Sequence, residues 1–156
     1  MKTKQDGPNL VRNNNFADGL EQWTVDASPD TVHATEYAGR TAARFDRRVG
    51  GFIGQGTTGL LTAGHYVFAF SAAGEGSGPM NAIMMNVTVA YEDGGYESSR
   101  TNRFTATSDW GRTDLFGINL ERNARSVDIG FFVDGPGPEA VAGHVYVTDV
   151  SLQRRD

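Results

Sequence analysis

The sequence predicts an all-β protein, an antiparallel β-sandwich of the jelly-roll type. Glycine is frequent, with 20 of 156 residues, and it separates short runs rich in Val, Thr, Phe and Tyr, which is typical of strands joined by tight turns. No window shows the apolar period of an amphipathic helix. The chain has no cysteine, so the Cys…Trp…Cys pattern of immunoglobulin domains is absent and a jelly roll is favoured.

The length and charge restrict the class of protein. A chain of 156 residues fits one domain, expected over residues 9–153 after a disordered tail at 1–8. The net charge of -5 argues against a nucleic-acid partner, and no apolar run approaches the roughly 18 residues of a membrane span. The start, MKTKQDGPN, lacks the apolar core of a secretion signal. It suggests either a full cytosolic chain or an excised module with a new first Met.

The first third of the chain is expected to contain short strands that pair with distant partners. Order is expected from Asn9, where turn-forming NNN and ADG clusters separate apolar anchors. Those anchors are predicted to join the core: Leu10, Phe16, Leu20 and Trp23. The next strands are predicted at Val32 to Tyr37, Thr41 to Asp46 and Gly51 to Thr57.

The middle of the chain contains two clearer patterns. Aromatic residues alternate with small ones from Tyr66 to Ser71, which predicts a strand buried on one side. A strand from Ala82 to Tyr91, an EDGG hairpin and a return strand from Tyr96 to Thr107 follow. One face of the first hairpin strand is expected to point toward solvent or a ligand: Met84, Asn86, Thr88 and Glu92.

The last third is expected to supply three further strands. One lies around Thr113 to Leu120, and the next lies in the segment RSVDIGFFVDGPGP, with Val127 on one face and Phe132 on the other, mostly polar face. The last runs from Gly143 to Leu152 and places Asp149 inside an apolar run. A buried carboxylate needs a partner, which here is a backbone amide pair, an arginine or a bound cation.

Four segments together resemble a known family. NLVRNNNF…GLEQW, YAGRTAARF, Q…GLLTAGHYVFAFSA and VYVTDVSL occur in the order and approximate spacing seen in jelly-roll carbohydrate-binding modules of bacterial cellulases and xylanases. The resemblance spans residues 9 to 152. It implies a galactose-binding-like sandwich of the cellulose- and xylan-binding type.

The resemblance implies a sugar site across one sheet face, where rings stack on sugars and polar groups pair with hydroxyls. By the order of the strands, the candidate ligand-binding residues are Phe52, Gln55, Asn86, Tyr96, Arg100 and Arg103. Tyr91 is a weaker candidate because its alternation points inward, and Phe132 is a further one. Trp23 and Trp110 are both expected in the core.

The resemblance also implies a structural calcium ion near the last strand. Its expected ligands are the carboxylate of Asp149, the carbonyl of Gly39 and oxygens between Asn14 and Asp18, because Ca²⁺ takes six to eight oxygen ligands. The family usually has two consecutive Asp residues in the last strand and an acid directly after the opening Phe. This chain has Thr148 and Ala17 at those places. The alternative is that Asp149 accepts backbone N–H bonds.

The sequence is compatible with three candidate functions. The first is non-catalytic polysaccharide binding that targets an attached enzyme, in a secreted, extracellular protein of which this chain is part. The second is a structural or adhesion module of a surface or phage protein. The third is a small hydrolase or lyase, for which Glu92 with Glu97, or Tyr96 with Arg103 and His33, would supply the chemistry. His33, His65 and His144 lack metal-ligand spacing.

Overall fold

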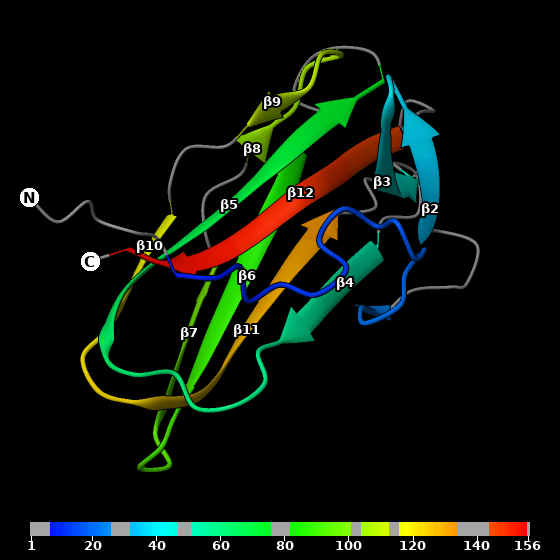
Figure 1. Cartoon of the computed structure of the whole chain (residues 1–156). Coiled ribbons are helices and arrows are strands. Elements are labelled where there is room, and N and C mark those ends of the chain that lie inside the picture. The colour runs from blue at the N-terminus through cyan, green and yellow to red at the C-terminus, as the bar shows by residue number, and fades with distance from the viewer. Residues whose placement is uncertain are drawn as a thin grey trace, which may run out of the picture.

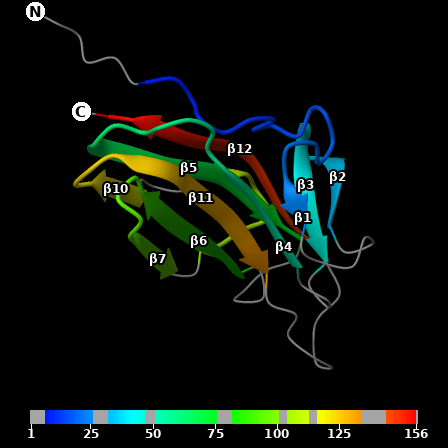
Figure 2. The same cartoon turned by 90° about the horizontal axis from the view of Figure 1, so that it is seen from below.

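The computed structural model is a sandwich of two antiparallel sheets that face each other across a shared core (Figures 1 and 2). It describes residues 7–25, 32–46, 51–75, 82–100, 104–112, 116–133 and 144–155. Within these ranges every regular element is a strand. No helix in the described ranges is long and apolar enough to cross a membrane.

The first sheet, sheet A, has the strand order β1-β4-β11-β6-β7, and β8 also pairs with β6. All of these pairings are antiparallel. The strands are β1 (Thr24–Val25), β4 (Gly51–Gly56), β6 (Ala82–Tyr91), β7 (Tyr96–Arg100), β8 (Phe104–Thr105) and β11 (Ala124–Val133).

The second sheet, sheet B, has the order β10-β5-β12-β3-β2, and β9 also pairs with β5. These pairings are antiparallel as well. The strands are β2 (Val32–Tyr37), β3 (Arg40–Asp46), β5 (Gly64–Gly74), β9 (Gly111–Arg112), β10 (Phe116–Leu120) and β12 (His144–Arg154). β2 and β3 pair with each other as a hairpin, contrary to the expectation that the strands of the first third pair only with distant partners. β6 and β7 form a second hairpin. By contrast, β4 pairs with β11 and β3 with β12, which lie far away in the sequence.

The predicted all-β sandwich is confirmed, and most strands lie where the sequence places them. β2 and β6 have the predicted bounds, and β3 and β4 differ from them by one residue at one end. The predicted return strand from Tyr96 is β7 followed by β8, and residues 101–103 between them lie outside the described part. The strand predicted around Thr113 to Leu120 corresponds to β10, and its residues 113–115 lie outside the described part.

The core between the sheets is rich in aromatic side chains. Phe131 of β11 packs against Phe70 with ring centroids 4.8 Å apart, against Phe68 at 5.6 Å and against Trp23 at 6.3 Å. Trp23 in turn stacks on Phe16 at 5.1 Å. Truncating one such buried ring costs about 3–5 kcal/mol, so this cluster joins the opening segment firmly to both sheets.

The two ends of the chain run side by side. The Gly7 amide donates to the Arg154 carbonyl and the Leu10 amide to the Leu152 carbonyl. The opening segment therefore lies along β12 (Figure 1). Gly7, the first described residue, already takes part in this pairing, and residues 1–6 are outside the described part.

A β-bulge changes the alternation of β12. Thr148 pairs with Ser71 and Ser151 with Ala69, so one extra residue is inserted between these pairs. Asp149 adopts a φ of 50° at this point, a conformation that Asp tolerates better than most residues. The bulge lets Val150 point into the core while the Asp149 side chain stays 45% exposed. The sequence wrongly predicted a buried carboxylate, because the bulge moves it to the surface.

Candidate functional site

The outer face of sheet A carries the candidate site, which is formed by alternate residues of β4, β11, β6 and β7. Phe52 of β4 lies opposite Phe132 of β11, which lies opposite Met84 of β6. In the next row, Gly54 lies opposite Gly130 and Gly130 opposite Asn86. The inward side chains of these strands are core residues, so these two rows face away from the core.

The two glycines provide the space in which the Phe52 ring lies. A methyl group added to Gly130 would meet Cε2 of Phe52 at 2.4 Å, and one added to Gly54 would meet its Cζ at 2.8 Å. The ring therefore covers the backbone of both neighbouring positions, yet the residue is only half-buried. A ring supported from below by the sheet and open above is a rigid apolar surface for a ligand.

Phe132 and Met84 extend this surface, and we call the three side chains Phe52, Phe132 and Met84 the apolar platform. All three are half-buried. A shallow hollow of about 50 Å³ lies against the platform and is lined also by Met85 and Asn86. The hollow holds no more than a small group, so a ligand at this place rests on the surface.

Polar side chains follow the platform along the same face. The carboxylate of Asp128 lies over Gly56, with Oδ1 2.2 Å from the position of an added methyl group. Neither Asp128 nor the Asn86 amide has a hydrogen-bond or ion-pair partner among the described side chains. By contrast, Thr88 and Ser98 bond each other at 2.7 Å. Asp128 and Asn86 therefore retain hydrogen-bonding capacity for a ligand.

The face also contains Tyr96, which is 71% exposed. Tyr96 pairs with Ala90 of β6, six residues from Met84, which is about 20 Å along the strand. It lies three strands from Phe52 in the sheet order, about 14 Å across. The structure thus places Phe52, Asn86 and Tyr96 on one face, with the two rings far apart.

Two predicted arginines are described only in part or not at all. The backbone of Arg100 pairs with Asn86, and its side chain lies outside the described part of the structure. Arg103 also lies outside the described residues.

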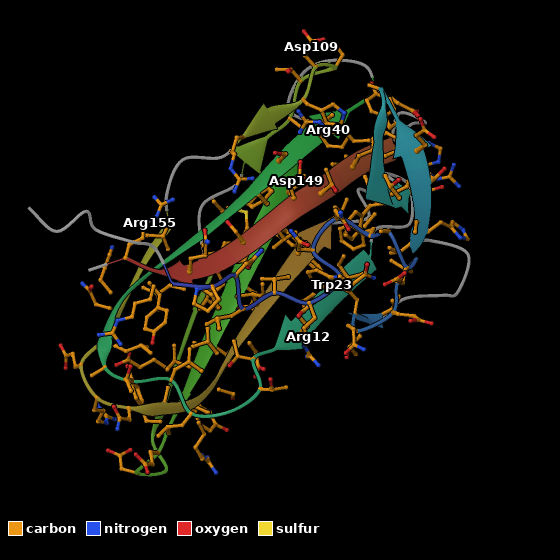
Figure 3. The ribbon with its side chains drawn as sticks, viewed as in Figure 1. Arg12, Trp23, Arg40, Asp109, Asp149 and Arg155 are labelled. Atoms are coloured by element: carbon orange, nitrogen blue, oxygen red, sulfur yellow. The ribbon has the colours of Figure 1, made fainter. Side chains whose placement is uncertain are left out.

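Gln55 does not reach this face. It alternates with Phe52 and points inward, where it is 8% exposed. Its amide bonds the main chain of Arg12 twice, accepting from the amide at 2.9 Å and donating to the carbonyl at 2.9 Å. Figure 3 shows Arg12 beside β4. Gln55 therefore holds the opening segment against β4, because an inward polar residue must bond a buried partner.

The surroundings of Asp149 do not provide a typical calcium site. The carboxylate pairs with Arg40, whose Nη1 lies 3.1 Å from Oδ2. Asp18 is exposed, and its amide bonds the Asn13 side chain. Gly39 lies in the turn between β2 and β3. No group of three or more His, Cys, Asp or Glu side chains among the described residues is placed to hold a metal. The carboxylate that would bind Ca²⁺ here is already paired with a guanidinium, which does not suit a second cation at the same oxygens.

One of the constellations considered for catalysis is divided between the two sheets, and the other lies within the β6–β7 hairpin. His33 lies on β2 of sheet B, whereas Tyr96 lies on β7 of sheet A. Glu97 accepts a hydrogen bond from Tyr91 at 3.3 Å, and Glu92 lies in the hairpin turn. The three histidines lie on separate strands, β2, β5 and β12.

A second polar cluster, which the sequence did not reveal, lies on the outer face of sheet B. The Glu75 carboxylate accepts a short hydrogen bond of 2.5 Å from the Tyr146 hydroxyl, and its other oxygen lies 3.2 Å from Nδ1 of His144. Burial alone would raise the pKa of Glu75, but these hydrogen bonds outweigh it and the pKa lies below its ordinary value. Burial and the Glu75 bond raise the pKa of Tyr146. Tyr37 stacks on Tyr146 at 4.1 Å, which closes the cluster.

Trp110 is not in the core, contrary to the sequence prediction. It is half-buried, donates to the Tyr37 carbonyl at 3.1 Å and packs edge-on against that ring. Trp23 is buried as predicted.

The sequence alone could not show how Phe132, Met84 and the two glycines complete the site. Phe132 and Met84 alternate onto the outer face in the sequence itself, but their pairing with Phe52 depends on the strand order. The role of Gly54 and Gly130 likewise requires the register of β4 and β11, which no local pattern specifies.

Comparisons with known proteins identify the fold. No family profile and no curated protein matches the sequence, whereas solved structures match most of it. A family 16 carbohydrate-binding module is 16% identical, with a TM-score of 0.68 over 92% of this chain and 99% of the other. TmCBM61, solved with β-1,4-galactotriose, is 17% identical, with a TM-score of 0.60 over 95% and 99%.

A longer protein contains the same fold as one part. The CBM22-1–GH10 modules of Clostridium thermocellum xylanase 10B, solved with xylohexaose, are 12% identical, with a TM-score of 0.64 over 95% of this chain and 29% of the other. At these identities the likeness shows the fold alone. The chain has the jelly-roll fold of carbohydrate-binding modules.

Proposed function

We propose that this chain binds a polysaccharide or oligosaccharide through the outer face of sheet A and has no catalytic role of its own. The observation that carries the proposal is the apolar platform, with the Phe52 ring supported by Gly54 and Gly130. A pyranose ring has an apolar face of C–H groups that stacks on such a surface. Asn86 and Asp128 beside the platform offer a donor and acceptors for the surrounding hydroxyls.

The spacing of the rings favours a polymer as the ligand. Phe52 and Tyr96 are about 20 Å apart along the strands, so a single sugar contacts only one of them. A chain of several sugars that crosses the face reaches both. The affinity is therefore expected to rise with the length of the oligosaccharide until both rings are covered.

We further propose that this chain is one module of a larger protein that contains an enzyme. A module of this fold is joined to a catalytic domain in the xylanase described above, which supports an attached enzyme for this chain. We propose an extracellular location together with it. The proposed role is then to hold that enzyme at its substrate. The enzymatically active domain of tailspike protein 4 of bacteriophage CBA120 contains the same fold, with a TM-score of 0.67 over 92% of this chain and 21% of the other. A module of a phage protein therefore stays the second candidate, and a small hydrolase or lyase stays the third.

Affinity electrophoresis tests the proposal. The chain is run through gels containing xylan, mixed-linkage glucan, galactan, mannan or pectin, and at least one polymer is expected to retard it. Phe52→Ala and Tyr96→Ala should reduce the retardation. Leu60→Ala is the matched control, because Leu60 is 55% exposed and lies outside the strands of sheet A. If no polymer retards the chain, the adhesion module is favoured, and release of reducing sugar would indicate an enzyme.

A further inference from the structure

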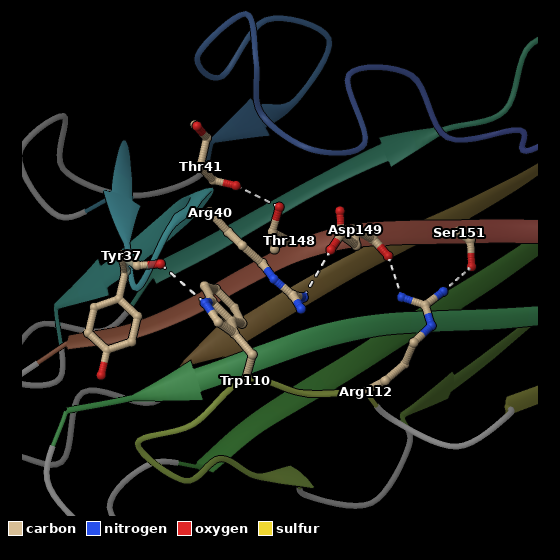
Figure 4. A network of polar contacts seen from close by, with 8 residues as sticks. All are labelled: Tyr37, Arg40, Thr41, Trp110, Arg112, Thr148, Asp149 and Ser151. Atoms are coloured by element: carbon tan, nitrogen blue, oxygen red, sulfur yellow. Dashed lines mark hydrogen bonds and ion pairs between the residues drawn. The ribbon is translucent and has the colours of Figure 1, made fainter.

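The junction between the chain ends and β3 contains two arginines around one aspartate (Figure 4). The Asp149 carboxylate points outward from the bulge of β12 and pairs with Arg40. The Asp149 carbonyl accepts from Arg112 at 2.8 Å, and Arg112 also donates to Ser151 at 3.0 Å. Both kinds of Asp149 oxygen, side chain and main chain, are therefore bound by guanidinium groups.

Local structure holds Arg40 in this place. It follows a turn in which Ala38 and Gly39 have φ values of 46° and 83°, and it begins β3. Its guanidinium lies over the Trp110 ring, 5.4 Å from the ring centroid. A cation over an indole ring is attracted by the negative face of the ring. Arg40 is thus positioned by the turn on one side and by Trp110 on the other.

The pocket beside this pair contains oxygen atoms that suit a cation. Its volume is about 290 Å³. The opening segment forms part of its wall. The Val150 amide of β12 holds this segment in place by donating a hydrogen bond to the Asn14 carbonyl at 3.1 Å. The lining residues are Asn15, Ala17, Arg40, Thr41, Thr148 and Asp149.

We propose that Arg40 is the built-in counter-cation of this junction and replaces a bound metal ion there. The guanidinium supplies a positive charge at the Asp149 carboxylate and joins the start of β3 to β12 without calcium. Removing Arg40 leaves Asp149 beside a pocket of hydroxyl, amide and carbonyl oxygens, the ligand types of Ca²⁺. Arg40→Ala is therefore expected to acquire a calcium site. This inference is independent of sugar binding.

Thermal unfolding with EDTA or with millimolar CaCl₂ at constant ionic strength tests this proposal. The wild-type Tm is expected to be equal in both buffers. Arg40→Ala should lower the Tm in EDTA by about 1–4 °C, because the exposed pair is lost, and calcium should restore part of that loss. Arg40→Ala with Asp149→Asn should not respond to calcium. Arg12→Ala is the matched control, because Arg12 is an exposed arginine that bonds Gln22 and the Gly56 carbonyl and pairs with no carboxylate among the described residues. Its removal should not create a calcium response.

Terbium luminescence gives a second measurement by a different principle. Trp110 lies beside Arg40, so Tb³⁺ bound in the pocket of Arg40→Ala should be sensitised by indole excitation, and calcium should displace it. Wild type should show no such signal. The proposal is overturned if EDTA lowers the wild-type Tm, or if Arg40→Ala responds to calcium and terbium no more than wild type does. Should Arg40→Ala not fold, a wild-type Tm sensitive to EDTA would still refute the proposal.

Discussion

Gly130→Ala is the sharpest test of how the apolar platform is built. The new methyl group would lie 2.4 Å from Cε2 and 2.6 Å from Cζ of Phe52, far inside van der Waals contact. Its nearest main-chain neighbour is the Ile53 carbonyl at 3.1 Å, a much milder contact. The ring, at the end of a side chain that can rotate, must therefore leave its place while the sheet is kept.

The size of the effect follows from the area that the ring offers. One face of a Phe ring in contact with a sugar is expected to contribute about 1–2 kcal/mol to binding. Its loss weakens binding about 5- to 30-fold. Calorimetric titration with the polymer found by electrophoresis, on wild type, Gly130→Ala and Phe52→Ala, measures this loss. The Tm of each variant shows that the fold is kept.

The double variant separates this explanation from a general disturbance of the face. Once Phe52→Ala has removed the ring, the methyl group of Gly130→Ala has nothing to displace. The two losses are then expected to be strongly non-additive. If Gly130→Ala weakens binding as much in the Phe52→Ala background as in wild type, the ring is not the group through which it acts.

Three further predictions concern other positions. Gln55→Ala should lower the free energy of unfolding, measured in urea, by about 1–3 kcal/mol, because the Arg12 main chain loses both of its Gln55 partners. Sugar affinity should not change. An unchanged stability would contradict the role given to Gln55. Glu75→Gln should lower the Tm at neutral pH. Because the folded pKa of Glu75 lies below its ordinary value of 4.5, the difference in Tm between this variant and wild type should shrink as the pH falls below about 4.5. A difference in Tm that grows on acidification would contradict this prediction. Tyr96→Ala should weaken binding of long oligosaccharides more than short ones in titrations with chains of increasing length, whereas an equal loss at all lengths would place Tyr96 in the same subsite as Phe52.

Strand positions were predictable because local composition determines them. The alternation from Ala82 to Tyr91 and the EDGG turn specify β6 and its hairpin without any tertiary information, and β2 needed no more than its flanking turns. The ends of a strand were less predictable where hydrogen bonding to a neighbouring strand, rather than a local turn signal, determines them. β11, for example, begins at Ala124, one residue before the segment that the sequence indicates, because it continues pairing with β6 past a register shift.

The site was predictable only as far as alternation reaches. Alternation correctly placed Asn86 outward and Tyr91 inward. It could not show that Gln55 is needed by a distant main chain, because that need arises only when the opening segment lies on β4. Nor could it show that the bulge at Asp149 reverses the alternation of β12. Phe52 was found through family resemblance, and the reason its ring lies where it does is a pair of glycines on two strands.

Backbone amide shifts test the central claim most directly. A ¹⁵N-labelled sample is titrated with an oligosaccharide of the polymer that retards the chain in electrophoresis. We expect the largest shift changes at residues 52–56, 84–90 and 128–132, with smaller changes near Tyr96. Changes confined to sheet B or to its loops, or no change with any retarding polymer, would contradict a sugar site on the outer face of sheet A.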